Sequence, residues 1–481
     1  MAKKIQKAIN LFCWVPLVLS FVGYYICDGG INGTSLSVWE AIYASITLYF
    51  VNPVSDNQNI LILLGKFLSL IVTTNVIFSV LSFFVDSLSK WWNRMWKDST
   101  TIYTDCELGK IICDGCKHGY LIEADGVKHI KFEKTINHIL IFSDDKMALH
   151  LLNNIQSAPG TCNIYVLLNN IDTSLLSSEY ENVHYYNIND ILAREYWKKN
   201  NLYKEINSVY CKKKFKIGIV GYESLGKALF KQAYLSNLYN LNQSIEYHIF
   251  GGDKYQKTFL ESLILGNNDK IIVHLEDWTE CINEMIDLDR IIITYENNID
   301  IIETLINENP TLNIWAYSIF NDNLSKVFES DTVHFFGKIT SFLNEKTIKS
   351  EQTYKNAKLL NLDYYLNSNR LEFPNDYELE MNRQWKKLTG FKRNSNIARA
   401  DYFWIEDRKK QEGANEEEIC RMEHIRWCRF HYINHWSYGT EKNEKTKSHP
   451  LLVEYDKLPY SERKKDGINI LEIKNMIETL M

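Results

Sequence analysis

The stretch SVWEAIYASITLYFVNP, residues 37 to 53, lies between two long apolar runs and constrains the fold more than any other part of the sequence. It is too short to cross a bilayer, whose hydrocarbon core of about 30 Å takes about 20 helical residues. Four apolar side chains nevertheless recur at helical spacing: Trp39, Ile42, Tyr43 and Ile46. The segment then ends in Pro, so it predicts a short amphipathic helix followed by an extended bend.

The two flanking apolar runs, residues 9–28 and 59–88, are each long enough to cross a membrane as a helix. The first follows the basic stretch MAKKIQK and has no small-residue cleavage site after it, so we interpret it as a retained span rather than a signal peptide. The second is followed by SKWWNRMWK, in which Trp suits the headgroup region and Lys and Arg suit the cytoplasmic side. Residues 1–98 therefore predict an α-helical hairpin, multi-pass in the inner membrane, with both termini and residues 89–481 in the cytoplasm.

A half-length segment between two spans is typical of a re-entrant pore loop, here residues 37–53. Non-helical backbone at membrane depth must be buried by protein or lined by water, and a symmetric ring of hairpins provides both. This predicts a homo-oligomer, most simply a tetramer, whose narrowest point is formed by Thr47, Leu48, Tyr49, Phe50, Val51 and Asn52. The alternative is a hairpin that only anchors the chain and carries an interfacial amphipathic loop.

The segment resembles the pore helix of two-span potassium channels, whose pattern A-x-Y-x-S-x-x-T is approximately matched by Ala41, Tyr43, Ser45 and Thr47. The resemblance implies a cation pore. It does not extend to the filter, because the family's TVGYG would fall at TLYFVNP, which contains no Gly. Carbonyl-lined filters use Gly to reach the backbone conformations they need at low cost.

From residue 99 the sequence alternates short β-rich runs with helical patterns, and the alternation restarts near residue 212. This predicts an α/β region of two doubly wound Rossmann-type units with parallel sheets, residues 99–205 and 212–345. The pattern resembles the RCK domains that regulate potassium conductance and the wider NAD-binding family of potassium uptake proteins. The resemblance implies a cytoplasmic gating ring.

The turn IGIVGYESLGKAL, residues 217–229, partly matches the dinucleotide-binding fingerprint. Gly221 and Gly226 occupy its first and third glycine positions, and Asp253 follows the next predicted strand, where an acid that binds ribose is expected. Glu223 replaces the middle glycine and brings a carboxylate to the place where phosphate would sit. A scaffold that assembles subunits is thus the preferred interpretation, and an NAD-like cofactor is not expected.

The C-terminal part, residues 350–481, is predicted to be a small, mainly α-helical domain with a helical lead-in. Its stretch EEEICRMEHIRWCRFHYINHWSYG, residues 416–439, predicts a helix that ends near Gly439, where a left-handed cap is possible. The region resembles the RyR domain of ryanodine receptors over residues 383–475, through Ser395, Asn396, Ala400, Glu423, His424, Arg426, Trp427, Trp436, Tyr438, Gly439, His449, Pro450, Val453, Tyr455, Leu458 and Asp466. Prokaryotic copies are often coupled to nucleotide signalling and phage-defence effectors, which implies a ligand sensor.

Arginine and aromatic side chains in this domain suit an anionic ligand, either a small molecule such as a nucleotide or an oligonucleotide. Guanidinium groups pair with phosphate and indole rings stack on bases. The candidate residues are Arg393 and Arg399 in a predicted loop around Ser395 and Asn396, together with Glu423, His424, Arg426, Trp427, Trp436 and Tyr438. The alternative is that Glu423, Arg426 and the Trp residues form an internal ion pair and an aromatic core.

Composition excludes several other classes of function. The net charge of −6 provides no basic field for duplex nucleic acid. The ten Cys residues are scattered, and the single pair CDGC, residues 113–116, is a weak zinc signal, so no metal site is predicted. No pattern of nucleophile and base indicates an enzyme. The sequence therefore predicts a ligand-gated ion channel, conducting cations and acting in phage defence, and the alternative is a membrane-anchored nucleotide-sensing scaffold without a pore.

Overall fold

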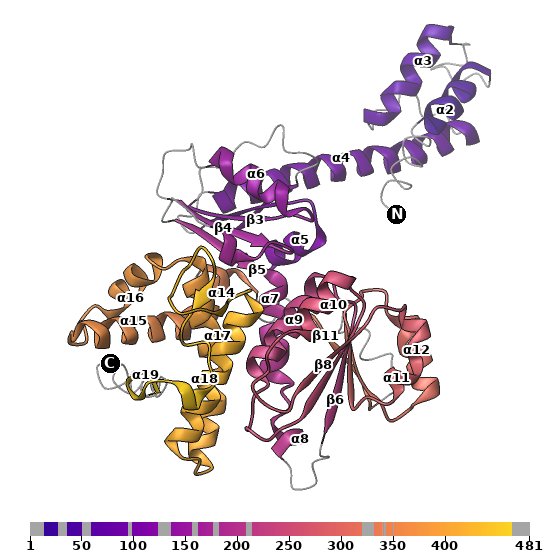
Figure 1. Ribbon diagram of the computed structural model, residues 1–481. Coiled ribbons are helices and arrows are strands. Elements are labelled where there is room, and N and C mark those ends of the chain that lie inside the picture. Colours follow the sequence, from indigo (N-terminus) through magenta and orange to yellow (C-terminus); the bar gives the residue numbers. More distant parts are fainter. Residues whose placement is uncertain are drawn as a thin grey trace. The chain divides into compact units, whose positions relative to one another are not determined.

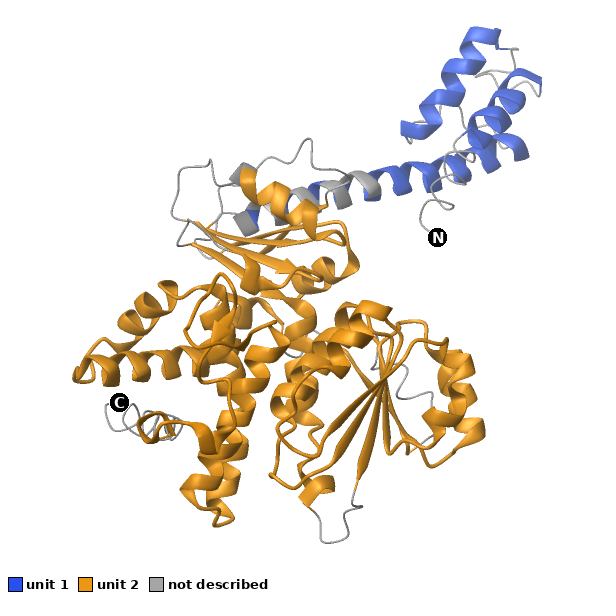
Figure 2. Ribbon diagram, in the orientation of Figure 1, with its two compact units in different colours: residues 1–96 blue, residues 97–481 orange. Residues whose placement is uncertain are grey.

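The computed structural model of the chain contains two compact units, residues 1–96 and 97–481, which are coloured separately in Figure 2. The structure describes residues 14–26, 36–50, 59–94, 99–123, 136–155, 162–176, 182–207, 214–319, 331–338, 340, 343–349 and 351–463.

The N-terminal unit consists of helices only, in its described part. They are α2 (Val15–Ile26), α3 (Val38–Thr47), the 3-10 turn η1 (Leu48–Phe50) and α4 (Ile60–Arg94). Of the described helices, one is long and apolar enough to cross a membrane, over Ile60–Phe78 of α4, and only 17% of that window is buried. Helix α2 is apolar but covers part of the first predicted span, because residues 9–13 and 27–28 lie outside the described part of the chain.

Small residues allow α2 and α4 to pack closely. A Cβ added at Gly65 of α4 would lie 2.0 Å from Ser20 Oγ of α2, and one added at Gly23 would lie 2.7 Å from a side-chain carbon of Ile62. Close approach at glycine is a common way for helices to associate in membranes, where burying apolar surface gives no advantage over lipid.

A first parallel sheet begins the C-terminal unit. Its strands are β1 (Thr100–Thr104), β2 (Gly119–Glu123), β3 (Asn137–Ile141), β4 (Asn163–Leu168) and β5 (Val183–Asn187), in the order β2-β1-β3-β4-β5. Its helices are α5 (Glu107–Asp114), α6 (Asp145–Ile155), the turn η3 (Thr173–Leu175), α7 (Ile188–Lys199) and α8 (Tyr203–Asn207). β1 and β3 are buried along their whole length, as expected for strands covered on both faces.

A second parallel sheet has the doubly wound order β11-β10-β9-β6-β7-β8. Its strands are β6 (Phe215–Val220), β7 (Ile245–Phe250), β8 (Lys270–His274), β9 (Arg290–Ile293), β10 (Asn313–Tyr317) and β11 (Val333–Phe336). Its helices and turns are α9 (Ser224–Ser236), α10 (Lys254–Glu261), η4 (Trp278–Glu280), α11 (Ile282–Ile286) and α12 (Ile299–Glu308). Parallel α/β sheets of the Rossmann kind are therefore present, as predicted.

Helices dominate after the second sheet. They are α14 (Glu345–Lys349), η6 (Gln352–Tyr354), α15 (Lys355–Asn369), α16 (Tyr377–Lys386), α17 (Gly390–Gln411), α18 (Glu416–Ile433), η7 (Tyr455–Lys457) and α19 (Tyr460–Arg463), with the two-residue strands β12 (Ser437–Tyr438) and β13 (Ser448–His449). The predicted cap at Gly439 is wrong, because α18 ends at Ile433. His435, with φ 64°, takes the left-handed conformation instead.

One hydrophobic core runs through parts of the chain that the sequence assigned to separate domains. Tyr196 and Trp197 of α7 pack with the second sheet, and so do Tyr402 of α17 and Phe430 of α18. In Figure 1, α7, α9 and α17 lie together at the centre of this unit. The C-terminal helices are thus built into the Rossmann core and are not a separate appendage.

Candidate functional site

The predicted pore helix forms as α3, and its start is fixed by a capping box. Ser37 Oγ accepts a hydrogen bond from the backbone N–H of Glu40 at 3.4 Å, and the backbone N–H of Ser37 donates to Glu40 Oε2 at 2.8 Å. Thr47 is the last residue of α3, and Leu48, Tyr49 and Phe50 follow in η1. Val51 and Asn52, the rest of the predicted constriction, lie outside the described residues.

Two hydroxyl groups of α4 hold the backbone that follows α3. Thr73 Oγ1 donates to the carbonyl of Tyr49 at 2.8 Å, and the single hydroxyl proton of Ser69 is shared between the carbonyls of Leu48 at 3.1 Å and Lys66 at 2.9 Å. The hydroxyl of Thr47 is used within α3, where it donates to the carbonyl of Ala44 at 2.8 Å. These contacts fix the peptide after α3 on α4.

The two faces of α3 differ in exposure. Ala41, Ala44 and Leu48 pack into the helical unit, whereas Trp39 and Tyr43 are 80% and 67% exposed. Large apolar side chains along α4 are exposed as well. An apolar surface of this extent fits lipid or neighbouring copies of the chain better than water.

At the second sheet, the turn between β6 and α9 has the backbone of a dinucleotide fold but carboxylates at its rim. Gly221 has φ 91°, and a Cβ at Gly226 would lie 1.9 Å from the carbonyl oxygen of Gly221, so both glycines are required by close packing. Exposed Glu223 is the N-cap residue of α9. Asp253 caps α10, where its Oδ1 accepts from the N–H of Gln256 at 2.8 Å.

The first sheet's loops approach the same turn. Ser224 Oγ, in the first turn of α9, donates a hydrogen bond to Asn170 Oδ1 from the loop after β4. The start of α9, where a pyrophosphate would bind in a Rossmann enzyme, is therefore in contact with the first sheet's half of the unit.

In the C-terminal helices, a buried cluster of charges joins α17 to α18. Arg426 makes two parallel hydrogen bonds to Glu423, from Nε at 2.6 Å and from Nη2 at 2.7 Å. Arg399 Nη1 lies 2.5 Å from Glu423 Oε2 and 2.5 Å from Glu406 Oε1. Glu423 and Arg426 thus form the internal ion pair that the sequence left open as an alternative, and Arg399, expected in a loop, joins it through Glu423 and Glu406.

This charge cluster carries more positive charge than negative charge. Burial raises the pKa of the Glu406 carboxyl to about 8, despite the opposing effect of Arg399, so Glu406 is mostly protonated at pH 7. The pKa of Glu423 is lowered, because Arg399 and Arg426 outweigh its burial. Arg426 Nη1 is buried and has no hydrogen-bond partner among the described residues. Two guanidinium groups therefore share about one carboxylate charge.

A cleft of about 310 Å³ opens beside the charge cluster. Its lining residues are Glu406, Lys410, Ala414, Glu416, Ile419 and Cys420. Volumes of about 300 to 1,000 Å³ are typical of small-molecule sites. A protonated Glu406 can donate a hydrogen bond into this cleft, and Lys410 adds a positive charge to it.

The aromatic candidates lie along α18 and in the segment that follows it. The ring of half-buried Trp427 is 4.0 Å from that of His431 and 5.0 Å from that of His449, while Trp436 is buried at 5.4 Å from His431. Burial lowers the pKa of His431 to about 4, so its imidazole is neutral at pH 7. Because Trp436 is buried, it is part of a core.

The two other predicted ligand-binding residues, His424 and Tyr438, lie in different surroundings. His424 donates from Nε2 to the carbonyl of Val453 at 2.8 Å, which ties α18 to the segment after β13. Tyr438, in β12, is 59% exposed and points to solvent.

The loop predicted around Ser395 and Asn396 is wrong, because both residues lie inside α17. Arg393 lies in the first turn of the same helix and donates to two carbonyls at the end of α16, those of Trp385 at 3.2 Å and Lys386 at 3.0 Å. This is the interaction by which basic side chains commonly satisfy a helix C-terminus. Arg393 therefore points to α16, whereas Arg399 points to α18.

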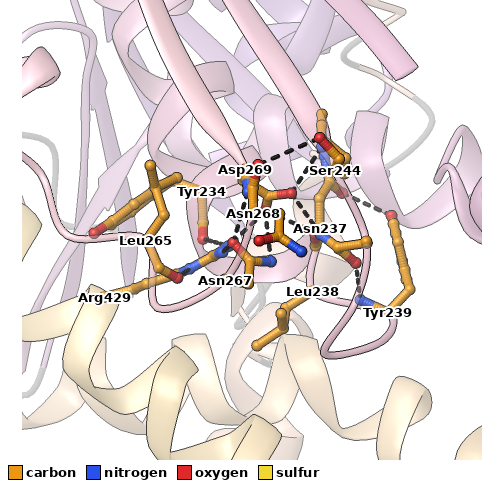
Figure 3. Close-up of polar contacts among 12 residues, drawn as sticks. Tyr234, Asn237, Leu238, Tyr239, Ser244, Leu265, Asn267, Asn268, Asp269 and Arg429 are labelled. Carbon is orange, nitrogen blue, oxygen red and sulfur yellow. Dashed lines mark hydrogen bonds and ion pairs between the residues drawn. The ribbon is translucent and has the colours of Figure 1, made fainter. Parts of the chain in front are cut away.

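The sequence reasoning missed Arg429, which Figure 3 shows between α18 and the second sheet. Its guanidinium is fully buried and donates to the carbonyls of Leu265 at 2.8 Å and Tyr234 at 3.0 Å, to Asn267 Oδ1 at 3.0 Å and to Asp269 Oδ2 at 2.9 Å. Helix α18 carries several other charged residues, so no signal in the sequence singled out Arg429.

A second missed pair connects α17 to the first sheet's half of the unit. Arg194 of α7 makes a bidentate ion pair with Asp401, with distances of 2.5 and 2.7 Å. The amide of Gln232 in α9 also lies 3.3 Å from the Asp401 carboxylate. Helix α17 is thus bonded to α7 and α9 at the same point.

Residues 409–481 match the RyR domain family. The predicted RyR domain is confirmed over this range, which includes α18 and the cleft-lining residues from Lys410 onward. No curated protein matches the chain.

Solved structures that match part of the chain include two of GsuK. The structure of GsuK bound to ADP is 13% identical, with a TM-score of 0.35, covering 73% of this chain and all of that one. The GsuK channel is 11% identical, with a TM-score of 0.35, covering 73% and 83% of the two chains. A dipicolinate synthase component from Bacillus halodurans is 11% identical, with a TM-score of 0.22, covering 50% and 85%.

Proposed function

We propose that the chain is a ligand-gated, cation-conducting channel of the inner membrane, without enzymatic activity, whose cytoplasmic RyR module senses an anionic, nucleotide-type ligand. The observation that carries the proposal is the half-length helix α3 and the anchoring of the peptide after it. Ten helical residues extend about 15 Å, which is half of a hydrocarbon core of about 30 Å. The C-terminal end of a helix carries a partial negative charge, which favours a cation near Leu48 to Phe50.

The proposed pore requires several copies of the chain. A single hairpin cannot shelter the backbone that follows α3, and the exposed apolar face at Trp39 and Tyr43 suits a contact with a neighbouring copy. A closed ring, most simply a tetramer, would place residues 47–52 around its axis.

The proposed sensor is the cleft beside the charge cluster. An anionic ligand there would meet Lys410, would accept a hydrogen bond from protonated Glu406, and would offset the excess positive charge of Arg399 and Arg426. A ligand can bias a gate only by the difference between its affinities for the two states. Movement of α17 relative to α18 would change the cleft and also the contacts that Asp401 and Arg429 make with the two sheets.

Reconstitution in planar bilayers tests the pore. Thr73→Val removes the hydroxyl that holds the Tyr49 carbonyl, a bond worth about 1 kcal/mol, so the population of the conducting arrangement should fall roughly fivefold. Thr74→Val changes the exposed neighbour in the same helix and should leave conductance as in the parent chain. Equal conductance in both variants would contradict the role given to the anchored peptide.

The sensor is tested in the same bilayers with a panel of ADP-ribose, NAD⁺, cyclic AMP and cyclic dinucleotides. Lys410→Gln should weaken the response to the active compound about tenfold, the effect of one lost charge-assisted contact, whereas Lys392→Gln, exposed on the same helix, should not. Binding of a panel member without any ion current would support the alternative, a membrane-anchored scaffold. A role as an effector in phage defence belongs to the same proposal and rests on the resemblance to prokaryotic RyR modules.

A further inference from the structure

Three residues with different metal-binding atoms meet at the end of the edge strand of the second sheet. His274 is the last residue of β8, Glu276 follows in the next turn, and Cys281 precedes α11. One ligand atom of each residue, a ring nitrogen, a carboxylate oxygen and a thiol sulfur, lies within 4.8 Å of the other two. This group is separate from the pore segment and from the RyR module.

We propose that His274, Glu276 and Cys281 bind a zinc ion. Nitrogen, oxygen and sulfur ligands together suit Zn²⁺, whereas Mg²⁺ and Ca²⁺ prefer oxygen alone. Zinc bonds of about 2.0 to 2.3 Å place tetrahedral ligands about 3.3 to 3.8 Å apart, so the three ligand atoms would approach one another by at most about 1.5 Å on binding. Glu276 is exposed and can supply this movement through its side chain.

The surroundings hold His274 in position for a metal. His248 Nδ1 lies 3.1 Å from His274 Nε2, the two rings are nearly parallel at 13°, and Phe250 stacks on His274 at 4.5 Å. Histidine ligands in metal sites are usually oriented by a hydrogen bond of this kind.

Negative charge around the thiol also favours a cation. The carboxylates of Glu284, Glu276 and Glu280 lie near Cys281. A bound zinc ion would stabilise the thiolate, and the thiol proton would pass to solvent. The ion would tie the turn after β8 to the start of α11, and with three protein ligands one coordination position would stay open to water.

Cobalt(II) provides the test, since it replaces zinc and is coloured. The full chain in detergent, with any affinity tag removed, should bind one Co²⁺ per chain and show a thiolate-to-cobalt absorption band together with tetrahedral visible bands. Cys281→Ser should abolish the thiolate band, whereas Cys162→Ser, at a half-buried thiol in the first sheet's half of the unit, should retain it.

Two variants at exposed side chains test metal binding without changing the buried core. Glu276→Gln should weaken Co²⁺ and Zn²⁺ affinity at least tenfold, while Glu280→Gln, also exposed and only in the surrounding field, should change it less than threefold. His248→Phe should weaken affinity about 10- to 100-fold, as for other outer partners of a metal-bound histidine. A thiolate band that survives Cys281→Ser, or that disappears with Cys113→Ser, would overturn the proposal.

Discussion

Replacing Arg429 with Met should loosen α18 from the second sheet. The guanidinium is fully buried and makes hydrogen bonds to four acceptors, and the Asp269 carboxylate is equally buried. Breaking one side of a buried ion pair typically costs about 3 to 5 kcal/mol, because the remaining charge has no compensation. Asp269 keeps three donors, the backbone N–H of Ile245 at 2.8 Å and the side-chain amides of Asn267 at 2.9 Å and Gln243 at 3.0 Å, so we expect a cost of about 3 kcal/mol, at the low end of that range.

Hydrogen–deuterium exchange of the full chain measures this loss at the affected segments. A cost of about 3 kcal/mol corresponds to exchange faster by roughly two orders of magnitude for amides of α18 that exchange through opening of the α18–sheet contact. Arg421→Met is the matched control on the same helix. Arg421 pairs with Asp456 at an exposed position, and such pairs contribute about 0 to 1 kcal/mol. If both variants accelerate exchange of α18 equally, Arg429 does not hold the two parts together.

Three other perturbations follow from described contacts. The pKa of Glu406 in the folded state is raised to about 8, so the folded state binds more protons than the unfolded state between about pH 4.5 and 8, and stability should fall as pH rises through this window. The urea midpoint of Glu406→Gln should lack that part of the pH dependence. A midpoint that depends on pH in the variant as it does in the parent chain would contradict the raised pKa. Gly65→Val should separate α2 from α4 and reduce the population of the proposed oligomer in native mass spectrometry, whereas Leu64→Val, at an exposed neighbour, should leave that population unchanged. A double-mutant cycle with Arg194→Met and Asp401→Asn should give a coupling of about 1.5 to 3 kcal/mol in urea unfolding, and additive effects would exclude the bidentate pair.

The sequence predicted what depends on local periodicity. The apolar strand runs and the helical patterns between them indicated two parallel sheets, and the recurrence of Trp39, Ile42, Tyr43 and Ile46 indicated α3. Gly221 and Gly226 marked the tight turn after β6 because the required backbone conformation and close packing depend on those residues themselves.

Contacts between distant segments could not be read from the sequence. The candidate arginines looked equivalent, but Arg393 caps α16 and Arg399 contacts the carboxyl groups of Glu406 and Glu423, a difference set by which helices lie beside α17. The loop expected at Ser395 and Asn396 followed from their preference for turns, which the packing of a 22-residue helix overrides. The acceptors of Arg429 come from segments about 160 to 195 positions away, so no local pattern marks that site.

The shared core of α7, α9, α17 and α18 restricts how the RyR module could have been acquired or could be exchanged. A chain cut before α15 would expose Tyr402 and Phe430 and would leave the Arg429 guanidinium without the acceptors that the second sheet supplies. Transfer of the RyR module to another protein would therefore need the loop around Asp269 and the Arg194 side of α7 to move with it. Recombination would therefore have to keep residues 188 to 433, from α7 to α18, together, and the RyR module and the second sheet are expected to evolve together.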